Sequence, residues 1–383
     1  MSTPINPENI LVVDDNPTNL RLLSRILSER GYHPRAVTSG ERALASAEMT
    51  PPDLILLDIR MPGMDGYAVC RELKANPKTA EIPVLFISAL DDIQDKMRAF
   101  DAGGVDYITK PFQLEEVIAR VETHLALRRL QRDLQEANRR MQRELALAAQ
   151  VQASFLPKRI PRVEGWELEV TLLPAKLTSG DFFDMLRMPG GRLGILIADV
   201  VDKGVGAALF MAMSCALLRT YAVEHPTQPD QVFYAVNQRL LEYTAAHQFV
   251  TVFFGILNPE DGQLIYCNAG HNPPILVNSA NPESVQLLEY TGPPLGIMDD
   301  ATWLPMQVQL SPGDVCVLYT DGITEAESSQ HEFFSEERLV QVIQTNSAGP
   351  AAAIRGAVLN DVHQFTDGAP LSDDIALIVL RRQ

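Results

Sequence analysis

Charged and polar side chains end four short apolar runs in the first part of the chain. These residues are Asp14, Asp15, Asp58, Ser88 and Lys110. Crowded carboxylates repel one another, and a divalent cation that prefers oxygen ligands, here Mg²⁺, relieves the repulsion. A carboxylate braced by a cation can attack phosphorus, while a lysine neutralises the phosphate and a serine hydroxyl donates to it. The pattern predicts phosphoryl transfer to Asp58.

Four aspartates further along the chain form a second candidate site: Asp181 in SGDFFD, Asp199 in ILIADVVDKG, Asp321 in VLYTDGITEA and Asp373 in LSDDIALIVL. Carboxylates without cysteine nearby favour Mg²⁺ or Mn²⁺ over zinc. One bridging and several flanking carboxylates can hold two ions, which lower the pKa of a bound water and clamp phosphoryl oxygens. The set predicts metal-assisted hydrolysis of a phosphoester.

Each of these features also has an ordinary explanation. A DD pair commonly caps a helix, a DG pair commonly forms a turn, and Asp181 or Asp184 could cap a helix. The predicted chemistry therefore rests on the complete ordered sets of residues and not on their single members. We also expect a cis Lys110–Pro111 peptide bond that aims the lysine inward.

The elements that must position the first site alternate strands with helices over residues 8–111. The apolar runs are Ile10–Val13, Leu54–Leu57, Val84–Ile87 and Tyr107–Ile108, with helix-period segments such as Asn19–Arg30 and Gly40–Glu48 between them. Continuous apolar runs fit parallel strands that are buried on both faces. Since the carboxyl ends of such strands share one edge, the polar residues converge there.

Residues 112–157 contain no glycine and predict one long amphipathic helix. Leu127, Leu130, Leu134, Ala137 and Met141 recur at intervals of three or four, which indicates a two-stranded coiled coil and hence a homodimer. The two intervals of four that end at Leu145 form a stutter. Six arginines between residues 128 and 143 are equally explained by a solvated face with intrahelical ion pairs.

The remaining residues, from 158 onward, mix short strands with clustered helices, which predicts an α+β sandwich. The expected strands are Leu193–Ala198, Thr251–Leu257, Gln263–Cys267, Pro274–Val277, Asp314–Tyr319 and Ile375–Leu380. The expected helices are Ala207–Tyr221, Pro229–Ala246 and Glu336–Gln344. The apolar stretch Ala207–Leu218 is too short to span a bilayer and is read as a core helix.

The first region resembles the receiver domain of two-component response regulators over about residues 8–125, through LVVDD, LILLDIRMPGMDG, LFISA and DYITKPF. The resemblance implies a doubly wound α/β fold with a five-stranded parallel sheet. It also implies that Asp58 accepts a phosphoryl group from a histidine kinase. Asp14, Asp15, Asp58 and the backbone carbonyl of Arg60 would hold Mg²⁺, and Tyr107 would be the switch aromatic.

Residues from about 145 to 383 resemble PPM-type Ser/Thr protein phosphatases of the bacterial branch related to the stage II sporulation protein E. The matching stretches are LALAAQVQASFLP, SGDFFD, ADVVDKGVGAALFMA, CNAGHNPPIL, PLGI, LYTDGITEA and SDDIALIVL. The resemblance implies that Asp199 bridges two metal ions and that the Val200 carbonyl adds a ligand. Asp181, Asp321 and Asp373 would complete the sites, with Asp374 as the alternative to Asp373. The implied substrate is a phosphorylated anti-sigma-factor antagonist.

Two positions in this region leave alternatives open. The family usually has Ser-Gly or Met-Gly where this chain has Val201-Asp202 before Lys203. Loss of that glycine is expected to stiffen the loop, and it puts metal affinity in question. His271 in AGHNPP could donate a proton to the leaving hydroxyl, but such a histidine more often organises a loop.

Composition excludes several classes of protein. The chain has 383 residues, enough for two to three domains, and a net charge of −17 that argues against binding nucleic acid through its phosphates. Four scattered cysteines, without a C-x-x-C, indicate neither a zinc knuckle nor a disulfide framework. We find no signal peptide pattern and expect a cytoplasmic protein with no membrane partner.

These observations predict three parts: a receiver over residues 1–125, a helical coiled-coil linker over 126–157 and a phosphatase over 158–383. Phosphorylation of Asp58 would repack or dimerise the linker and so alter the metal loops. The alternative is a catalytically weak, phosphorylation-switched adaptor that sequesters a partner protein. A nucleic-acid-binding regulator is a third reading, which the acidic charge and the lack of a DNA-reading motif disfavour.

Overall fold

The computed structural model describes residues 7–88, 93–111, 113–243 and 248–383. The chain divides into two compact units, residues 1–140 and 141–383, and one helix contributes to both. The expected fold class, with a parallel α/β sheet, a long helix and an antiparallel sandwich, is confirmed. The expected domain boundaries at 125/126 and 157/158 stay predictions.

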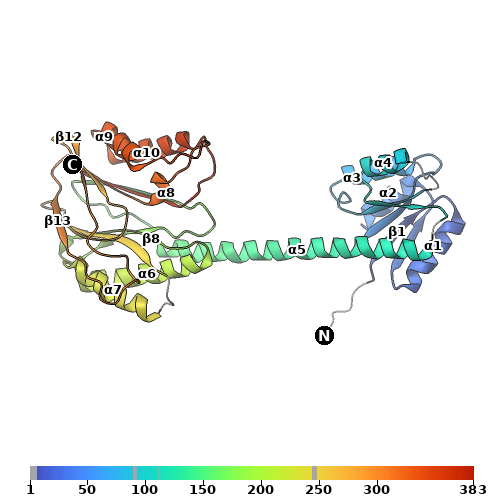
Figure 1. The fold of residues 1–383 in the computed structure, drawn as a ribbon, viewed down its shortest axis with the longest axis horizontal. Helices are drawn as coiled ribbons and strands as arrows, with labels where there is room; N and C mark the ends of the chain where they lie inside the picture. Colours follow the sequence, from blue (N-terminus) through green and yellow to red (C-terminus); the bar gives the residue numbers. More distant parts are fainter. Residues whose placement is uncertain (1–6, 89–92, 112, 244–247) are drawn as a thin grey trace. The chain divides into compact units, whose positions relative to one another are not determined.

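The first unit is one parallel sheet with helices on both faces (Figure 1). Its elements are β1 (Asn9–Val13), α1 (Pro17–Glu29), β2 (His33–Val37), α2 (Gly40–Met49), β3 (Leu54–Asp58), α3 (Gly66–Ala75), β4 (Val84–Ser88), α4 (Ile93–Asp101), β5 (Asp106–Thr109) and α5 (Leu114–Phe155). The strand order is β2-β1-β3-β4-β5. The apolar runs locate every strand except β2, because that edge strand is half-exposed.

Side chains on the two faces of this sheet pack against different helices. Leu11 and Val13 point into a core that α2, α3 and α4 cover, whereas Ile10 and Val12 pack against α1 and the first turns of α5. Alternate residues of one strand therefore serve both cores. This two-sided burial fixes the strands, and with them the edge at which their carboxyl ends meet.

The second unit is a sandwich of two five-stranded sheets. The first sheet has the order β13-β10-β9-β8-β7 and the second β12-β11-β14-β15-β6. The elements are β6 (Trp166–Leu173), β7 (Phe182–Arg187), η1 (Pro189–Gly191), β8 (Leu193–Val200), α6 (Val205–Glu224), α7 (Pro229–Tyr243), β9 (Val250–Leu257), β10 (Gln263–Ala269), β11 (Ile275–Asn278), β12 (Asn281–Leu287), β13 (Met306–Gln309), β14 (Val315–Tyr319), α8 (Asp321–Thr324), α9 (Glu336–Asn346), α10 (Ala351–Phe365) and β15 (Ile375–Arg382).

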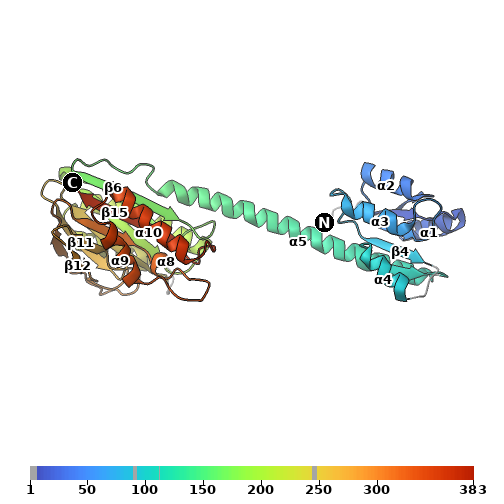
Figure 2. The same cartoon turned by 90° about the horizontal axis from the view of Figure 1, so that it is seen from above.

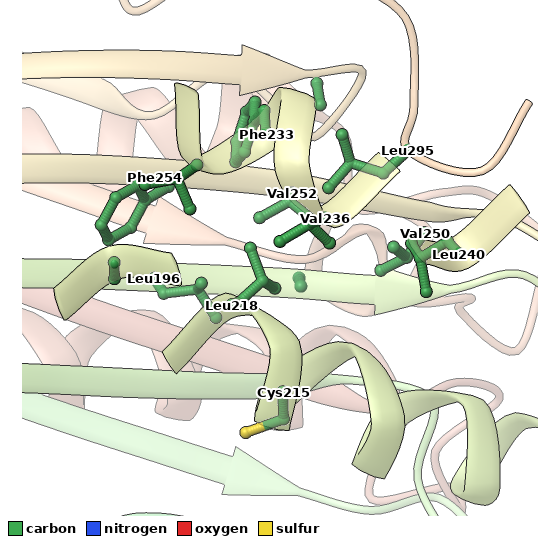
Figure 3. Close-up of a cluster of buried hydrophobic side chains, with 14 of the residues drawn as sticks. Leu196, Cys215, Leu218, Phe233, Val236, Leu240, Val250, Val252, Phe254 and Leu295 are labelled. Carbon is green, nitrogen blue, oxygen red and sulfur yellow. The ribbon is translucent and has the colours of Figure 1, made fainter. Parts of the chain in front are cut away.

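Helices cover the outer faces of both sheets, as Figure 1 shows for α6 and α7 on one side and α9 and α10 on the other. Figure 2 shows α9 and α10 over the sheet that contains β6 and β15. The apolar side chains between α6, α7 and the first sheet form the cluster in Figure 3, which includes Leu218, Phe233 and Phe254. A second cluster fills the space between the sheets, and a third lies under α9 and α10. Each layer thus buries its apolar face against the next.

Helix α6 is long and apolar enough, by composition alone, to cross a membrane. In the structure its buried residues include Phe210, Met211, Cys215 and Leu218, which pack in the cluster on the first sheet. This confirms the expected core helix. Helix α7 confirms the expected helix as far as Tyr243, and the last expected residues, 244–246, lie outside the described residues.

Helix α5 is 42 residues long, in agreement with the expected long helix. Its first turns belong to the core of the first unit, because Val117, Ile118, Val121 and Leu125 are buried. Beyond them Leu130 and Leu134 are 66% and 71% exposed. The apolar stripe of the expected coiled coil is therefore unpaired in the single chain.

Candidate functional site

The first site lies at the carboxyl edge of the parallel sheet. Asp14 follows β1, Asp58 ends β3 and Lys110 follows β5. The Lys110 Nζ lies 3.0 Å from an Asp14 carboxylate oxygen and 2.9 Å from an Asp58 carboxylate oxygen. Ligand atoms of Asp14, Asp15 and Asp58 lie within 4.8 Å of one another. The structure therefore brings together the three carboxylates and the lysine.

Electrostatics at this edge suit a bound cation. Burial raises the pKa of Asp58 above its usual value, the Lys110 hydrogen bond opposes that shift, and Asp14 and Asp15 add to it. A cation would offset the burial and the repulsion together, and an oxygen-only donor set fits Mg²⁺. One half-buried contributor is not apparent from the sequence: the Asn19 amide donates to both oxygens of Asp14, at 3.2 and 2.9 Å.

The remaining receiver residues lie around this edge. Ser88 is buried at the end of β4, next to residues outside the described range. Tyr107 lies on β5, with the Lys96 ammonium 4.8 Å from its ring centre. Arg60 lies in the loop after β3, and Gly66 closes that loop because a Cβ there would lie 2.3 Å from the Asp58 carbonyl oxygen. The Lys110–Pro111 peptide bond is cis, as expected.

The second site begins where β7 and β8 pair. Phe182 pairs with Ala198, so Asp181 and Asp199 lie side by side, one residue beyond that pair. Their carboxyls contact each other. Burial, then the neighbouring Asp199, raises the pKa of Asp181 well above its usual range, while burial and Asp321 raise the pKa of Asp199 to about 7. Two carboxyls are thus held together against their repulsion.

Asp321 and Asp373 come from the second sheet. Asp321 begins α8, which only Thr320 separates from β14, and Asp373 precedes β15, which pairs with β14. Gly322 allows the two segments to cross, because a Cβ there would lie 1.9 Å from the Asp374 carbonyl oxygen. Burial, Glu325 and Asp373 raise the pKa of Asp321. Because both Asp321 and Asp373 also raise the pKa of Asp199, all four aspartates share one region.

The donor set of the second site fits divalent cations. One oxygen of Asp181, Oδ2, is buried without a hydrogen-bond partner, and such an orphan is costly unless a ligand covers it. Among the described residues, however, only the first site gathers three ligand groups within 4.8 Å. At the second site Lys203 forms an ion pair with Asp373, in which the ammonium lies 2.7 Å from a carboxylate oxygen.

Asp374 has a different place from Asp373. Its two carboxylate oxygens accept backbone N–H groups from Ala175 and Gly180, each at 2.8 Å. It therefore holds the loop that carries Asp181, whereas Asp373 is one-third exposed and faces Lys203. This arrangement favours Asp373 over Asp374 as a ligand.

The loop that departs from the family pattern has an unusual backbone. Asp202 adopts φ of 83°, in the left-handed region that favours glycine. Aspartate tolerates this region better than most residues, and its carboxylate accepts a hydrogen bond from the Lys203 N–H at 2.8 Å. The chain thus keeps the glycine-type turn with a non-glycine residue. The expected stiffening of the loop stays a prediction.

His271 is completely buried behind this site. Its Nδ1 lies 3.0 Å from the Thr251 hydroxyl, which in turn donates to the Asp199 carbonyl oxygen at 3.3 Å. Burial lowers the pKa of His271 to about 3, so the imidazole is neutral at ordinary pH. These contacts favour an organising role over proton donation.

Two further contributors were not expected from the sequence. The buried Thr320 hydroxyl contacts the Asp181 carboxyl and also accepts the Ala376 N–H at 2.9 Å. Gln152, near the end of α5, contacts the backbone just before Asp181. The sequence offers only their positions as signals. Thr320 stands one residue before Asp321, and Gln152 lies in the stretch LALAAQVQASFLP, which resembles the phosphatase family.

Comparison with known proteins finds a family match in each unit. Residues 189–383 match the family model described as Stage II sporulation protein E (SpoIIE). The matched range is just over half of the chain. Residues 10–122 match the response regulator receiver domain.

Similar whole proteins match parts of the chain. Protein IcfG of Synechocystis sp. (strain ATCC 27184 / PCC 6803 / Kazusa) is 32% identical over 268 residues, which is 62% of this chain and 41% of IcfG. The phosphoserine phosphatase RsbU of Bacillus subtilis (strain 168) is 29% identical over 262 residues, 68% of this chain and 75% of RsbU. The chain thus spans less than half of the length of IcfG.

Solved structures resemble the second unit. The SiaA-PP2C domain of Pseudomonas aeruginosa has a TM-score of 0.58 at 20% identity and covers 64% of this chain and 99% of its own, a likeness of fold alone. The RsbU and RsbW domains of Rv1364c from Mycobacterium tuberculosis have a TM-score of 0.51 at 26% identity, covering 60% of this chain and 63% of their own.

Proposed function

This chain belongs to the SpoIIE family and carries a response regulator receiver domain. From these two matches we propose that it is a metal-dependent Ser/Thr protein phosphatase controlled by phosphorylation of Asp58. The observation that carries the proposal is the contact between the buried Asp181 carboxyl and the half-buried Asp199 carboxyl, with Asp321 and Asp373 beside them. Carboxyls forced together in this way store repulsion that divalent cations would offset.

In the phosphatase, Asp181, Asp199, Asp321, Asp373 and the Val200 carbonyl would hold two ions, Mn²⁺ or Mg²⁺. When bound, such ions activate water and neutralise phosphoryl oxygens. The chain contributes the rest: β7 and β8 fix Asp181 against Asp199, while Gly322 lets Asp321 approach Asp373. The Lys203 ammonium, which pairs with Asp373 in the structure, would turn to a phosphate oxygen of the substrate.

The substrate is a phosphoserine or phosphothreonine on a protein, specifically a phosphorylated anti-sigma-factor antagonist. Similarity to RsbU, whose name describes a phosphoserine phosphatase, supports the phosphoserine part of this proposal. A cytoplasmic location fits such a partner.

In the receiver, Asp58 would accept the phosphoryl group from a cognate histidine kinase, while Asp14, Asp15 and the Arg60 carbonyl complete an Mg²⁺ site. Lys110 bonds to Asp58 and Asp14 and is placed to hold the incoming phosphate. Ser88 and Tyr107 then transmit the conformational change caused by phosphorylation along β4 and β5. Helix α5 passes it on, and its exposed apolar stripe pairs two chains as a homodimer.

Turnover of a phosphoserine peptide by the full chain tests the proposal, with Mn²⁺, Mg²⁺ or EDTA and with or without acetyl phosphate as phosphodonor. We expect turnover that needs the cation and a rate that acetyl phosphate changes. Absence of turnover together with tight binding of a phosphoprotein would favour the adaptor. A cation-independent rate would remove the metal assignment.

A further inference from the structure

A small cavity lies beside the acidic site of the second unit. Its volume is about 210 Å³, and Gly322 and Ser372 form part of its wall. These two residues are the chain neighbours of Asp321 and Asp373, which we assign to metal binding. The Lys203 ammonium, which pairs with Asp373, also donates to the Ser372 carbonyl oxygen at 3.4 Å. The cavity therefore begins within one residue of the carboxylates at which a phosphoryl group would bind.

Two loops build the walls of this cavity. One covers residues 326–331, between α8 and α9, and the other covers residues 366–372, between α10 and β15. The Ser329 hydroxyl donates to the Asp367 carboxylate at 3.1 Å and so joins the two loops. The Ser328 hydroxyl holds the first loop from within, because it accepts two backbone N–H groups of that loop, at 3.3 and 3.2 Å. The walls are thus connected to each other and braced by their own hydrogen bonds.

The backbone of both loops adopts uncommon conformations at the cavity. His331 and Asp367 have φ of 63° and 52°, in the left-handed region that residues with a side chain rarely adopt. Such conformations persist where the surrounding structure holds them, and they gather at ligand-binding sites. The Glu327 carboxylate and the His331 Nδ1, both in the wall, pair with each other. The loops therefore maintain a defined hollow, and two of its polar groups already have partners.

Apolar side chains supply much of the wall, and the volume suits one side chain. Ala326, Ala369, Pro370 and Leu371 line the cavity. Sites for whole small ligands measure roughly 300–1,000 Å³, so about 210 Å³ is too small for most cofactors. An engineered apolar cavity of about 150 Å³ admits benzene, however. Size and lining together fit a single apolar side chain such as leucine.

We propose that this cavity is a specificity pocket that takes an apolar side chain flanking the phosphoserine of the protein substrate. The inference rests on the proposed phosphatase function and adds the chemistry of the substrate to it. Three residues of extended chain span about 10 Å, so a residue within three positions of the phosphoserine reaches a cavity that begins next to Asp321 and Asp373. Burial of its side chain adds affinity that the phosphate alone does not provide.

The test measures kcat/KM of the full-length protein with Mn²⁺ on phosphoserine peptides. The peptides carry leucine, alanine or aspartate at each of the three positions on either side of the phosphoserine. At the position whose side chain enters the cavity, leucine should exceed alanine by at least about tenfold, as a difference in apolar size does in a fitted pocket. Aspartate should be no better than alanine. Equal values for the three residues at every position, or a preference for aspartate, would overturn the inference.

A variant that fills the cavity assigns the preference to it. Ala369 is an exposed residue of the wall, so Ala369→Leu adds volume there without a change in the buried core. This variant should lose the preference for leucine, through a higher KM for the leucine peptide. Ala352→Leu changes an exposed alanine at the start of α10, outside the cavity, and should keep the wild-type preference. A retained preference in Ala369→Leu, or an equal loss in Ala352→Leu, would place the selection elsewhere and overturn the inference.

The compound p-nitrophenyl phosphate separates this inference from the function on which it rests, because it has no flanking residue. Turnover of this compound by the wild type, together with equal turnover of all peptides, would retain the phosphatase and remove the pocket. If the wild type hydrolyses neither this compound nor any peptide, the proposed function fails, and the inference fails with it.

Discussion

The Lys203 ammonium lies 2.7 Å from the Asp373 carboxylate, so a cationic side chain is paired with a carboxylate that we assign to metal binding. The Asp373 hydrogen bond is the main reason why the pKa of Lys203 is raised, although burial opposes the shift. Both side chains are partly exposed, so the pair can open without a large desolvation cost. Under the proposed function, Lys203 would compete with a cation for Asp373, and we propose that it also contacts a substrate phosphate.

Lys203→Met should therefore change two constants in opposite directions. Removal of the positive charge should lower the Mn²⁺ concentration for half-maximal turnover, and loss of a phosphate contact should raise KM for the phosphopeptide, each by a few-fold. Steady-state kinetics at varied Mn²⁺ and substrate measure both. Lys158→Met, which removes an exposed lysine, is the control. If both constants stay at wild-type values, Lys203 has neither role.

Asp199→Asn should lose activity and gain stability. Turnover should fall on the order of 10³-fold, because the assigned bridging ligand is lost. In EDTA, however, the melting temperature should rise, since the amide removes a charge that burial and Asp321 disfavour. Calorimetric melting with EDTA and with Mn²⁺ measures this, with Asp300→Asn as the exposed control. A variant that remains active would refute the bridging assignment.

Asp58→Ala should leave the cation-dependent turnover of the phosphatase in place but remove its response to acetyl phosphate. Asp58 is the carboxylate that Lys110 contacts at 2.9 Å, and no methyl group can accept a phosphoryl group. Rates with and without acetyl phosphate are compared with those of Asp101→Ala, which removes an exposed carboxylate of the same unit. Persistence of the response in Asp58→Ala would place the phosphoacceptor elsewhere.

The sequence predicts most strands that are buried on both faces and misses half-exposed edge strands such as β2 and β6. β4 is buried throughout and appears as a continuous apolar run, whereas half-exposed β6 alternates Glu167 and Glu169 with apolar residues and was not identified. Burial on two faces leaves a compositional signal, but an edge or outer strand carries charged residues as a surface loop would.

The same distinction holds for the site. Asp14, Asp58, Asp199 and Asp321 lie at or close to the carboxyl ends of apolar strands, so strand ends indicate their places. The contacts of Gln152 cannot be read from the chain, because Ser179 is 27 residues away and the bonds go to its backbone. Likewise, Lys203 and Asp373 are 170 residues apart and meet only when the two sheets pack.

The exposed stripe on α5 leads to a prediction about assembly. Leu130 and Leu134 are 66% and 71% exposed in the single chain, and burial of a leucine contributes about 1.5–3 kcal/mol. The double change Leu130→Glu, Leu134→Glu should therefore weaken self-association by at least about a hundredfold, since both leucines would lose their partners.

Sedimentation equilibrium over a range of concentrations measures that change, with Gln131→Glu, Gln135→Glu as a control that adds the same charge on neighbouring exposed positions. Truncation after Ala137 removes Met141 and Leu145 from the stripe and should weaken self-association of the remaining fragment as well. If both double variants sediment like the wild type, α5 does not pair through this stripe. The apolar residues would then serve another contact, and control by Asp58 would have to act within one chain.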